Sequence, residues 1–408
     1  MTMTDGREMV VRIGGVEAGI LRYEDEAVTF RLEGDYLESA NRPVLGQVFE
    51  DDPTRLHRVR SGVPRWFANL LPEGPLRTLI AEAAGVHESR EYYLLGHLGE
   101  DLPGAVRVER LGESSTTTLD DQVPAEEIER DDSDFQLKFS LAGVQLKFSV
   151  LVDGRGATIP VSGSGGTSIL KLQDLRYEMV PENEFSMMVW AGEVGIEVPD
   201  VALIDVAKVE GLPDEVRESP GKGLLVTRFD RHGDDRIHIE DFAQILDHSP
   251  TTQGKYGGAN YETIGRILLE LSGIEDVHQY VRRLVAMVAM GNGDAHLKNW
   301  SVIYPDGRNA QLSPAYDLVA TNTLVKARET LALNLGKTKE FESIEIGSFR
   351  RMARKLNLPR ESAFDDVVKE TVARLQTSWL EIRGDLPASP SVKEEIARRL
   401  AELPLLQE

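Results

Sequence analysis

The sequence predicts an α+β protein with two lobes, one rich in strands and the other mainly helical, preceded by a small α+β subdomain. Two observations carry this prediction. Between residues 135 and 230, short apolar runs alternate with turns, as at 168–172 and 224–229, which indicates strands. After Asp241, apolar residues recur at helical spacing, notably over 261–272, 276–290 and 364–382.

The residue types divide the chain into four segments. Strand-like residues from Val10 to Phe49 and helical spacing from Pro64 to Gly96 indicate the first subdomain. A stretch rich in Ser, Thr and acidic residues then indicates a solvated linker. A last helix is predicted where Pro390 precedes a capping box that begins at Ser391. The expected segments are the subdomain 1–110, the acidic linker 111–134, the β-rich lobe 135–230 and the helical lobe 231–408.

The composition excludes several classes of protein. The 408 residues are 41% hydrophobic, which suffices for the cores of two or three domains, and no apolar run is long enough to span a membrane. The start of the chain lacks the basic and apolar regions of a signal peptide. The absence of cysteine excludes disulfides, thiolate metal sites and cysteine nucleophiles. We therefore expect a cytoplasmic protein without membrane contact.

The net charge is strongly negative. With 68 acidic against 46 basic residues the chain carries −22 charges, which opposes direct binding to the phosphates of nucleic acid. We expect any link to DNA to be indirect, through a basic partner attracted to this acidic surface.

The most informative motif is the segment Asn292–Asn299, which Asp317 follows. Asp294 precedes the amide of Asn299 by five residues, and Asp317 comes eighteen residues after that amide. Kinase-like phosphotransferases use the first carboxylate as a base, and the amide and second carboxylate as Mg²⁺ ligands. The alternative is that these side chains only satisfy turns.

The surrounding pattern predicts how these residues are brought together. An apolar helix over 276–290 would hold Asp294 on a rigid element, and Gly291 and Gly293 allow a sharp exit from that helix. A hairpin turning at Asp306-Gly307 would then return the chain and place Asp317 beside Asn299. Within the loop, His296 contacts a phosphate or, as we favour, braces the loop. Lys298 is a candidate γ-phosphate partner or a solvent-facing lysine.

Lys171 is the candidate for the lysine that pairs with nucleotide phosphates. It lies within an apolar strand, where an unpaired ammonium would be costly, and Glu184 on the following helix is its expected partner. The alternative is an edge-strand lysine that faces solvent. A second candidate phosphate site is a loop with one glycine, although an ordinary hairpin has the same local pattern. It comprises Ser140, Ala142, Gly143, Val144, Gln145 and Lys147.

The segment Thr227–Arg231 lies where the chain would cross between the lobes. Backbone groups of Thr227 and Arg228 are candidates to meet adenine, and Phe229 is a candidate to pack on its ring. Alternatively, Arg228 and Arg231 form structural ion pairs with Asp230 or Glu240. Tyr316 is a further candidate for nucleotide contact.

Several motifs in the same order resemble those of the HipA family, the toxin kinases of HipA–HipB toxin–antitoxin modules. The resemblance covers roughly residues 10 to 335. It is carried by Phe67–Gly74, Gly99–Val106, Ser140–Lys147, Ile169–Leu172, Glu182–Glu184, Arg228–Arg231, Gly291–Asn299 and Ser313–Leu318.

The resemblance implies a two-lobed, protein-kinase-like fold and an ATP- and Mg²⁺-dependent Ser/Thr protein kinase. Asp294 would be the base, Asn299 and Asp317 the metal ligands, and Lys171 the nucleotide lysine. Ser140 falls where family members carry an autophosphorylated serine, whose added charge would repel nucleotide phosphates. Family targets are aminoacyl-tRNA synthetases, and the usual partner is a HipB-like helix-turn-helix antitoxin that binds DNA.

The chain departs from the family at one position and leaves two other functions open. Relatives often have Gln where Ile239 precedes Glu240, so a nucleotide contact from that position is not expected here. A small-molecule phosphotransferase shares part of the Gly293–Asn299 pattern. A catalytically silent corepressor, acting only through its antitoxin, is the third possibility; its expected loss of Asp294, Asn299 or Asp317 is not seen.

Overall fold

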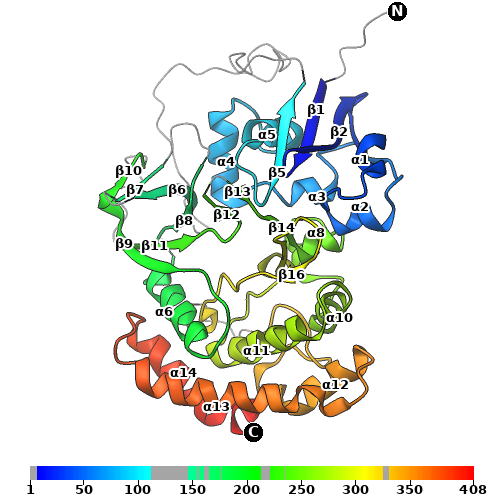
Figure 1. Cartoon of the computed structure of the whole chain (residues 1–408). Coiled ribbons are helices and arrows are strands. Elements are labelled where there is room, and N and C mark those ends of the chain that lie inside the picture. Colours follow the sequence, from blue (N-terminus) through cyan, green and yellow to red (C-terminus); the bar gives the residue numbers. More distant parts are fainter. Residues whose placement is uncertain are drawn as a thin grey trace, which may run out of the picture.

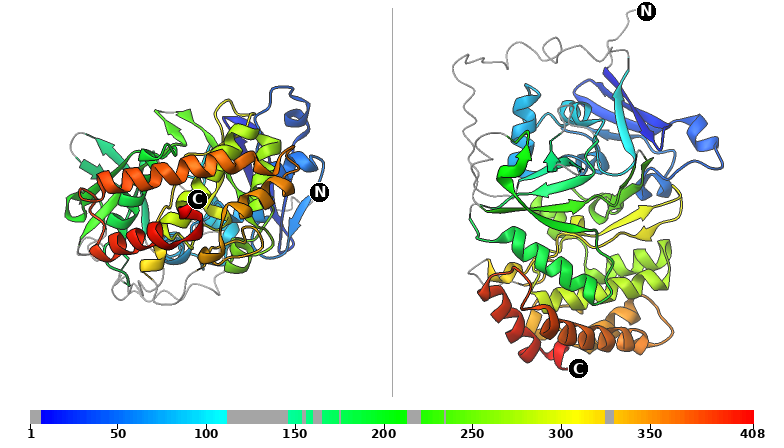
Figure 2. Two further views of the ribbon diagram at one scale, coloured as in Figure 1. Left: turned by 90° about the horizontal axis from the view of Figure 1, so that it is seen from below. Right: turned by 60° about the vertical axis from the view of Figure 1, so that its left-hand side comes forward.

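The computed structural model describes residues 7–111, 146–153, 156–159, 165–174, 176–212, 221–233, 235–324 and 330–408. Three hydrophobic cores lie within this part of the chain: one in the N-terminal domain, one in the strand-rich lobe and the largest in the helical lobe. Figure 1 shows the N-terminal domain resting against both lobes, and the second view of Figure 2 shows the same arrangement.

The N-terminal domain pairs a sheet with short helices. Its five strands lie in the order β4-β3-β2-β1-β5, and every pair is antiparallel. Apolar side chains alternate along the strands, and the inward ones pack against the helices. The elements are β1 Arg7–Ile13, β2 Val16–Glu24, β3 Ala27–Leu32, α1 Gly34–Glu38, α2 Gln47–Asp51, β4 His57–Val59, α3 Arg65–Ala68, α4 Gly74–Ala83, α5 Glu91–Leu98 and β5 Val106–Arg110.

The strand-rich lobe is built on a six-stranded sheet in the order β10-β7-β6-β8-β11-β9. Helix α6 (Val180–Glu193) packs below this sheet and joins it to the helical lobe (Figure 1). The strands are β6 Lys147–Asp153, β7 Gly156–Thr158, β8 Ser168–Lys171, β9 Val201–Asp205, β10 Val209–Glu210 and β11 Lys222–Thr227, and the hairpin β12 Arg231–His232 and β13 Asp235–Arg236 follows.

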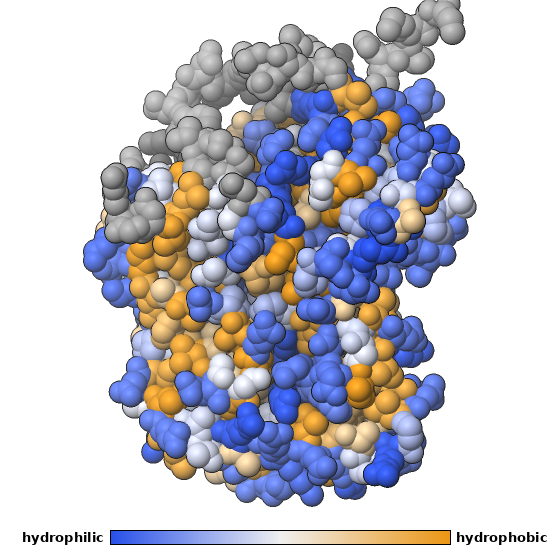
Figure 3. Space-filling model, viewed as in Figure 1, coloured by the Kyte–Doolittle hydropathy of each residue, from blue (hydrophilic) through white to orange (hydrophobic). Residues whose placement is uncertain are grey.

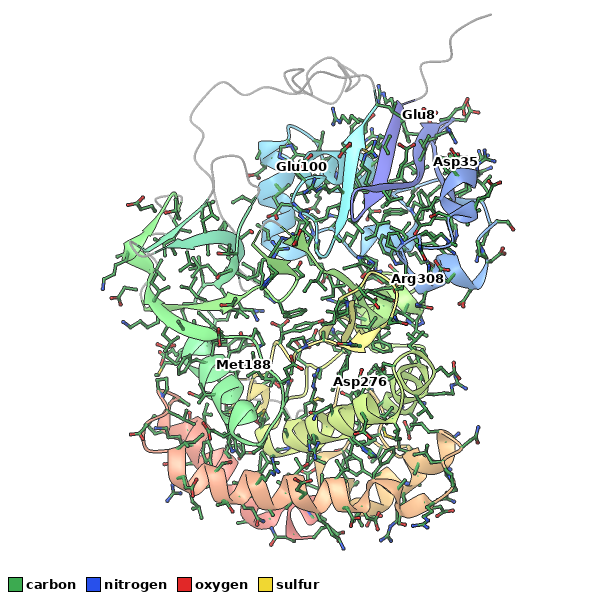
Figure 4. All side chains as sticks on the ribbon, viewed as in Figure 1. Glu8, Asp35, Glu100, Met188, Asp276 and Arg308 are labelled. Carbon is green, nitrogen blue, oxygen red and sulfur yellow. The ribbon has the colours of Figure 1, made fainter. Side chains whose placement is uncertain are left out.

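Helix α11 lies at the centre of the helical lobe, and most of its residues are buried. A small sheet, β14-β15-β16, lies between this helix and the N-terminal domain. Asp276 of α11, labelled in Figure 4, accepts a hydrogen bond from Leu312 N at 2.6 Å and fixes the end of that sheet. The elements are β14 His238–Asp241, α8 Phe242–Ile245, α9 Thr252–Tyr256, α10 Tyr261–Leu271, α11 Ile274–Met290, β15 Ser301–Tyr304, β16 Gln311–Leu312, α12 Ile346–Lys355, α13 Asp365–Ile382 and α14 Pro390–Glu402.

Two details of the predicted elements need correction. The cap of α14 is Ser389, not Ser391: its side chain accepts from Val392 N at 3.3 Å, which leaves Pro390 at the first helical position, where a missing N–H costs nothing. At the end of α11 only Gly291 adopts the left-handed conformation, with φ +69°, whereas Gly293 does not. A single residue of positive φ is enough to end that helix.

Buried charges join the N-terminal domain to the segment that follows β11. Asp230 accepts hydrogen bonds from Arg228 at 2.8 Å, from Arg231 at 2.7 Å and from Gly104 N at 2.8 Å. Asp101 completes the network with a 3.2 Å contact to Arg228. Because each of these side chains is nearly inaccessible to solvent, the ion pairs depend on one another.

Glu240 makes a second buried connection to the same domain. Its carboxylate is fully buried and accepts from Trp66 Nε1 at 2.8 Å, from Gln47 N at 3.0 Å and from Tyr304 OH at 3.0 Å. Burial raises the pKa of Glu240 to about 8, although these donors favour its ionised form. The tip of the β15–β16 hairpin adds a third connection, since Arg308 (Figure 4) donates to Ala40 O.

The surface is mostly polar. On the face seen in Figure 3, apolar residues gather mainly along the side that holds the six-stranded sheet. Leu151 and Val152 of β6 are among its exposed apolar side chains. No helix in the described parts of the chain is both long enough and apolar enough to cross a membrane.

Replacing Asp230 by Ala should lower the free energy of unfolding by about 3–5 kcal/mol, because Arg228 and Arg231 would lose a buried counter-ion. Urea unfolding followed by circular dichroism measures this loss. Asp235→Ala, at an exposed position of the next hairpin strand, is the matched control and should change stability by less than about 0.5 kcal/mol. Equal losses in the two variants would contradict the structural role of the network.

Candidate active site

Lys171 is the centre of a buried ion cluster between the two lobes. Its ammonium contacts Glu184 Oε1 at 2.5 Å and also the carboxylate of Asp317. Lys171 lies on β8 and Glu184 on α6, and both are almost fully buried. The predicted pairing of Lys171 with Glu184 is therefore confirmed, and the solvent-facing alternative is wrong.

In this cluster, neighbouring opposite charges offset the free-energy cost of burying an ionised group. Burial opposes the charge of Lys171, but Asp317 and Glu184 outweigh it and raise the pKa of this lysine. The carboxylate of Asp317 is only partly exposed, which disfavours its charge, yet Lys147 and Lys171 hold the pKa of its carboxyl well below the usual range. For Glu184 burial dominates, and its pKa is raised despite the neighbouring lysine.

Lys147, at the start of β6, contacts the same carboxylate. Its Nζ lies 3.3 Å from Asp317 Oδ2. Two lysines from the strand-rich lobe therefore meet one carboxylate of the helical lobe. The other members of the predicted phosphate loop, Ser140, Ala142, Gly143, Val144 and Gln145, lie outside the described residues.

Asp317 is held in an uncommon backbone conformation. Its φ is +53°, in the left-handed region that non-glycine residues seldom adopt. Asn292, buried after α11, donates from Nδ2 to Asp317 O at 3.2 Å. Strained residues of this kind concentrate at functional sites. The hairpin predicted at Asp306-Gly307 is confirmed and delivers Asp317 to this position.

The loop that carries Asp294 is braced by the same asparagine. Asn292 Oδ1 accepts from Asp294 N at 3.0 Å. Asn299 Nδ2 donates to Asp294 O at 3.3 Å, which closes the loop. The Asp294 side chain is exposed, and its Oδ1 accepts a hydrogen bond from the hydroxyl of Tyr256 on α9. A hydroxyl group can therefore reach this carboxylate.

The donor set near Asp317 suits Mg²⁺. Asn299 and Asp317 line one small cavity together with Asn292 and Tyr316. The hydrogen bond of Asn299 uses its amide N–H groups and not its oxygen, the atom that would ligate a metal. In the described ranges no three His, Cys, Asp or Glu side chains are placed so that they could hold a metal ion together. One carboxylate and one amide match an ion that completes its coordination with phosphate oxygens and water.

His296 contributes to the loop by packing. Burial lowers the pKa of its imidazole, which is therefore neutral at pH 7. Its ring lies edge-on to Tyr256 at 5.0 Å between centroids, and its Nδ1 is buried and has no hydrogen-bond partner among the described residues. The position of His296 agrees with the interpretation that this residue braces the loop. It does so by aromatic packing and not by the expected side-chain hydrogen bond.

Lys298 points toward the N-terminal domain. Its Nζ donates to Asn69 O at 3.0 Å and lies 3.1 Å from Glu73 Oε1. Glu73 also contacts Lys255, the neighbour of Tyr256, at 2.6 Å. In this structure the ammonium of Lys298 is thus engaged by protein groups, and its phosphate role stays a prediction.

The segment between the lobes contains both charged and aromatic candidates. Arg228 and Arg231 pair with Asp230, one of the two alternatives that the sequence left open. Phe229 lies beside Tyr316, with ring centroids 5.9 Å apart, and Thr227 is exposed. The arginine side chains thus serve the domain junction, whereas Phe229 and Tyr316 form one aromatic edge of the site.

Four residues of the site received no role from sequence reasoning. Asn292 lies inside the motif, but nothing in its spacing shows that it joins two loops. Asn183 exchanges hydrogen bonds with both backbone groups of Ala320, at 2.9 and 3.2 Å, and so fixes the chain after Asp317. Tyr256 and Glu73 reach the loop from distant segments, and only the motif Phe67–Gly74 contained a hint of the latter.

Comparison with known proteins identifies the family. The model of the HipA N-terminal domain matches residues 9–109, and the model of the HipA-like C-terminal domain matches residues 139–379. The second match alone spans more than half of the chain. The chain therefore belongs to the HipA family, as its motifs predicted.

Individual relatives agree with this assignment. Putative kinase Y4dM of Sinorhizobium fredii is 40% identical over 406 residues, which are 98% of this chain and 97% of that protein. The Serine/threonine-protein kinase toxin HipA of Shewanella oneidensis is 26% identical and covers 75% of this chain, and 74% of its own length is matched.

A solved structure has the same fold. HipA from the Shewanella oneidensis complex of HipA, HipB and operator DNA superimposes with a TM-score of 0.69 at 20% identity, and covers 98% of this chain and 96% of that chain. The predicted α+β, HipA-type fold is confirmed.

Replacing Lys171 by Met should make stability depend on pH. Glu184 would lose its buried counter-ion, and its folded pKa would rise further above the unfolded value of 4.5. An acid with a raised folded pKa stabilises the fold below its unfolded pKa, and this contribution is lost as the pH rises through the folded pKa. We expect a loss of about 3 kcal/mol at pH 8 that shrinks toward pH 5.

Thermal unfolding of the wild type and the variant across this pH range measures the effect. The double variant Lys171→Met/Glu184→Gln is the control, because it removes the titrating group and should flatten the curve. A pH-dependent loss that persists in the double variant would show that another group is responsible.

Proposed function

We propose that this chain is an ATP- and Mg²⁺-dependent Ser/Thr protein kinase that acts as the toxin of a toxin–antitoxin module. The main support is a single arrangement: Asn292 holds both Asp294 and Asp317, while Lys171, which is paired with Glu184, contacts Asp317 from the other lobe. This arrangement supports the proposal, because phosphoryl transfer requires a base, a metal ligand and a nucleotide lysine close together.

The proposed roles follow from the chemistry of each group. Asp294 accepts the proton of a Ser or Thr hydroxyl, whose oxygen attacks the γ-phosphorus of ATP. The bond from this phosphorus to the β–γ bridging oxygen breaks, and ADP leaves with the electron pair. When bound, Mg²⁺ would be held by Asn299 and Asp317 and would neutralise phosphate charge. Lys171 and Lys147 would pair with phosphate oxygens once they are drawn from Asp317.

Other parts of the site are proposed to recognise the nucleotide. Phe229 and Tyr316 would pack against adenine, with backbone groups of Thr227 and Arg228 nearby. Ala142, Gly143, Val144 and Gln145 would cradle phosphates through their N–H groups. His296 and Lys298 would support the catalytic loop. The corresponding domains are residues 1–110, 135–230 and 231–408, joined in part by the linker 111–134.

The proposed partners follow from charge and from the family. A HipB-like helix-turn-helix antitoxin would provide the contact with DNA, because a chain of net charge −22 is repelled by phosphates. The related HipA of Shewanella oneidensis occurs in a complex with HipB and operator DNA. The proposed substrate is a translation protein such as an aminoacyl-tRNA synthetase.

Asp294→Asn and Asp317→Asn should each lower phosphate transfer from ATP by at least about 100-fold, because one removes the base and the other a metal ligand. Transfer is measured as ADP release and as phosphate incorporated into the chain, with Mg²⁺ and again with excess EDTA. Asp306→Asn, in the nearby exposed turn, is the control, since asparagine can still accept the bonds from Arg308 N and Asn309 N.

An active control together with two inactive variants that remain folded at the assay temperature would support the role assignment. Substantial residual transfer in either variant would reject it. A wild type that consumes no ATP would favour the silent corepressor instead.

Ser140→Ala should remove most of the phosphate that the protein transfers to itself, if this serine is the family's autophosphorylated residue. Intact mass and peptide mapping after incubation of dephosphorylated protein with ATP and Mg²⁺ measure the change. Because the added charges would repel nucleotide phosphates, the phosphorylated wild type should also bind ATP more weakly. An unchanged phosphopeptide map would show that the regulatory serine lies elsewhere.

A further inference from the structure

Glu73 lies at the beginning of a helix, but its carboxylate contacts residues in another part of the chain. It occupies the N-cap position of α4, where a carboxylate normally accepts from the first N–H groups of its own helix. No such cap hydrogen bond is made. The carboxylate instead spans two lysines of the helical lobe, Lys298 at 3.1 Å and Lys255 at 2.6 Å.

These two lysines lie on the two segments that contact Asp294. Lys298 follows Asp294 by four residues in the same loop. Lys255 immediately precedes Tyr256, whose hydroxyl donates to Asp294. Both ammonium-bearing side chains are only 15% exposed. One carboxylate from the N-terminal domain therefore connects both supports of the candidate base.

The charges make this connection stronger than a surface ion pair. Burial disfavours the charge of Glu73, but Lys298 and Lys255 outweigh it and lower the pKa of its carboxyl. Asn69, four residues earlier, adds a backbone acceptor for Lys298. Removing the carboxylate would leave two cations close together without their shared counter-ion.

We propose that Glu73 is a positioning residue through which the N-terminal domain holds the catalytic loop and the Tyr256 segment in register for phosphoryl transfer. This inference rests on the proposed kinase function. Glu73 would contact neither nucleotide nor acceptor and would act through Lys298 and Lys255. A shift of the loop by about 1 Å is enough to lower a rate 100-fold, which sets the expected scale.

The variant Glu73→Gln keeps the size of the side chain and removes its charge. We expect kcat to fall about 10- to 100-fold while KM for ATP changes less than about twofold, because the lysine pair and aromatic edge of the nucleotide site are untouched. Arg65→Ala is the matched control. Arg65 also joins the N-terminal domain to the helical lobe, through Asp247 O at 3.1 Å, and in the described part of the chain its side-chain polar contacts are with Asp247 and not with the loop of Asp294.

A second measurement does not depend on activity. Lys298 and Lys255 should react faster with an amine-acetylating reagent in Glu73→Gln than in the wild type, and at the wild-type rate in Arg65→Ala; peptide mass spectrometry measures this. If Glu73 acts through Lys298, the loss of kcat in Glu73→Gln/Lys298→Met should be smaller than the product of the two single losses.

The outcomes separate this inference from the proposed function. An active wild type with an unchanged kcat in Glu73→Gln, or an equal loss in Arg65→Ala, would overturn the positioning role alone. Additive losses in the double variant would overturn it as well. A wild type that transfers no phosphate would instead reject the kinase function, whatever the reactivity of the two lysines.

Discussion

The carboxylate of Asp317 is the charge on which the junction of the two lobes depends. Lys147 and Lys171 reach it from the six-stranded sheet, and the hairpin of the helical lobe supplies it. Without this carboxylate, two ammonium groups would lie close together with Glu184 as the remaining counter-charge. Electrostatics here therefore sets the distance between the lobes as well as the charge state of the site.

The N-terminal domain is attached to the rest of the chain mainly by polar contacts. Asp230 and Glu240 are buried acceptors that take donors from this domain, and Glu73 reaches the catalytic loop directly. Buried polar contacts add little net stability but are costly to break, so they fix one docking geometry. The domain is thus part of the framework of the site and not an appended module.

The sequence predicted those features of the structure that depend on residues close together in the chain. The helix before Asp294, the hairpin before Asp317 and the ammonium buried at Lys171 each leave a pattern within a few residues, and each is present. Contacts between residues that are far apart in the sequence leave no such local pattern. Tyr256 lies 38 residues from Asp294, and Asn69 lies 229 residues from Lys298. The cap of α14 was misplaced because Ser389 and Ser391 both suit that role, and only the path of the chain chooses between them.

The two hydrogen bonds of the Asn292 side chain affect how the site can lose its arrangement. One amide group bonds the backbone of Asp294 with its oxygen and that of Asp317 with its nitrogen. A displacement of either loop must stretch or break this shared link, so the two carboxylates tend to move together. Partly assembled states, with the proposed proton acceptor in place but the proposed metal ligand displaced, are therefore disfavoured, and the site behaves as a unit that is either complete or dismantled.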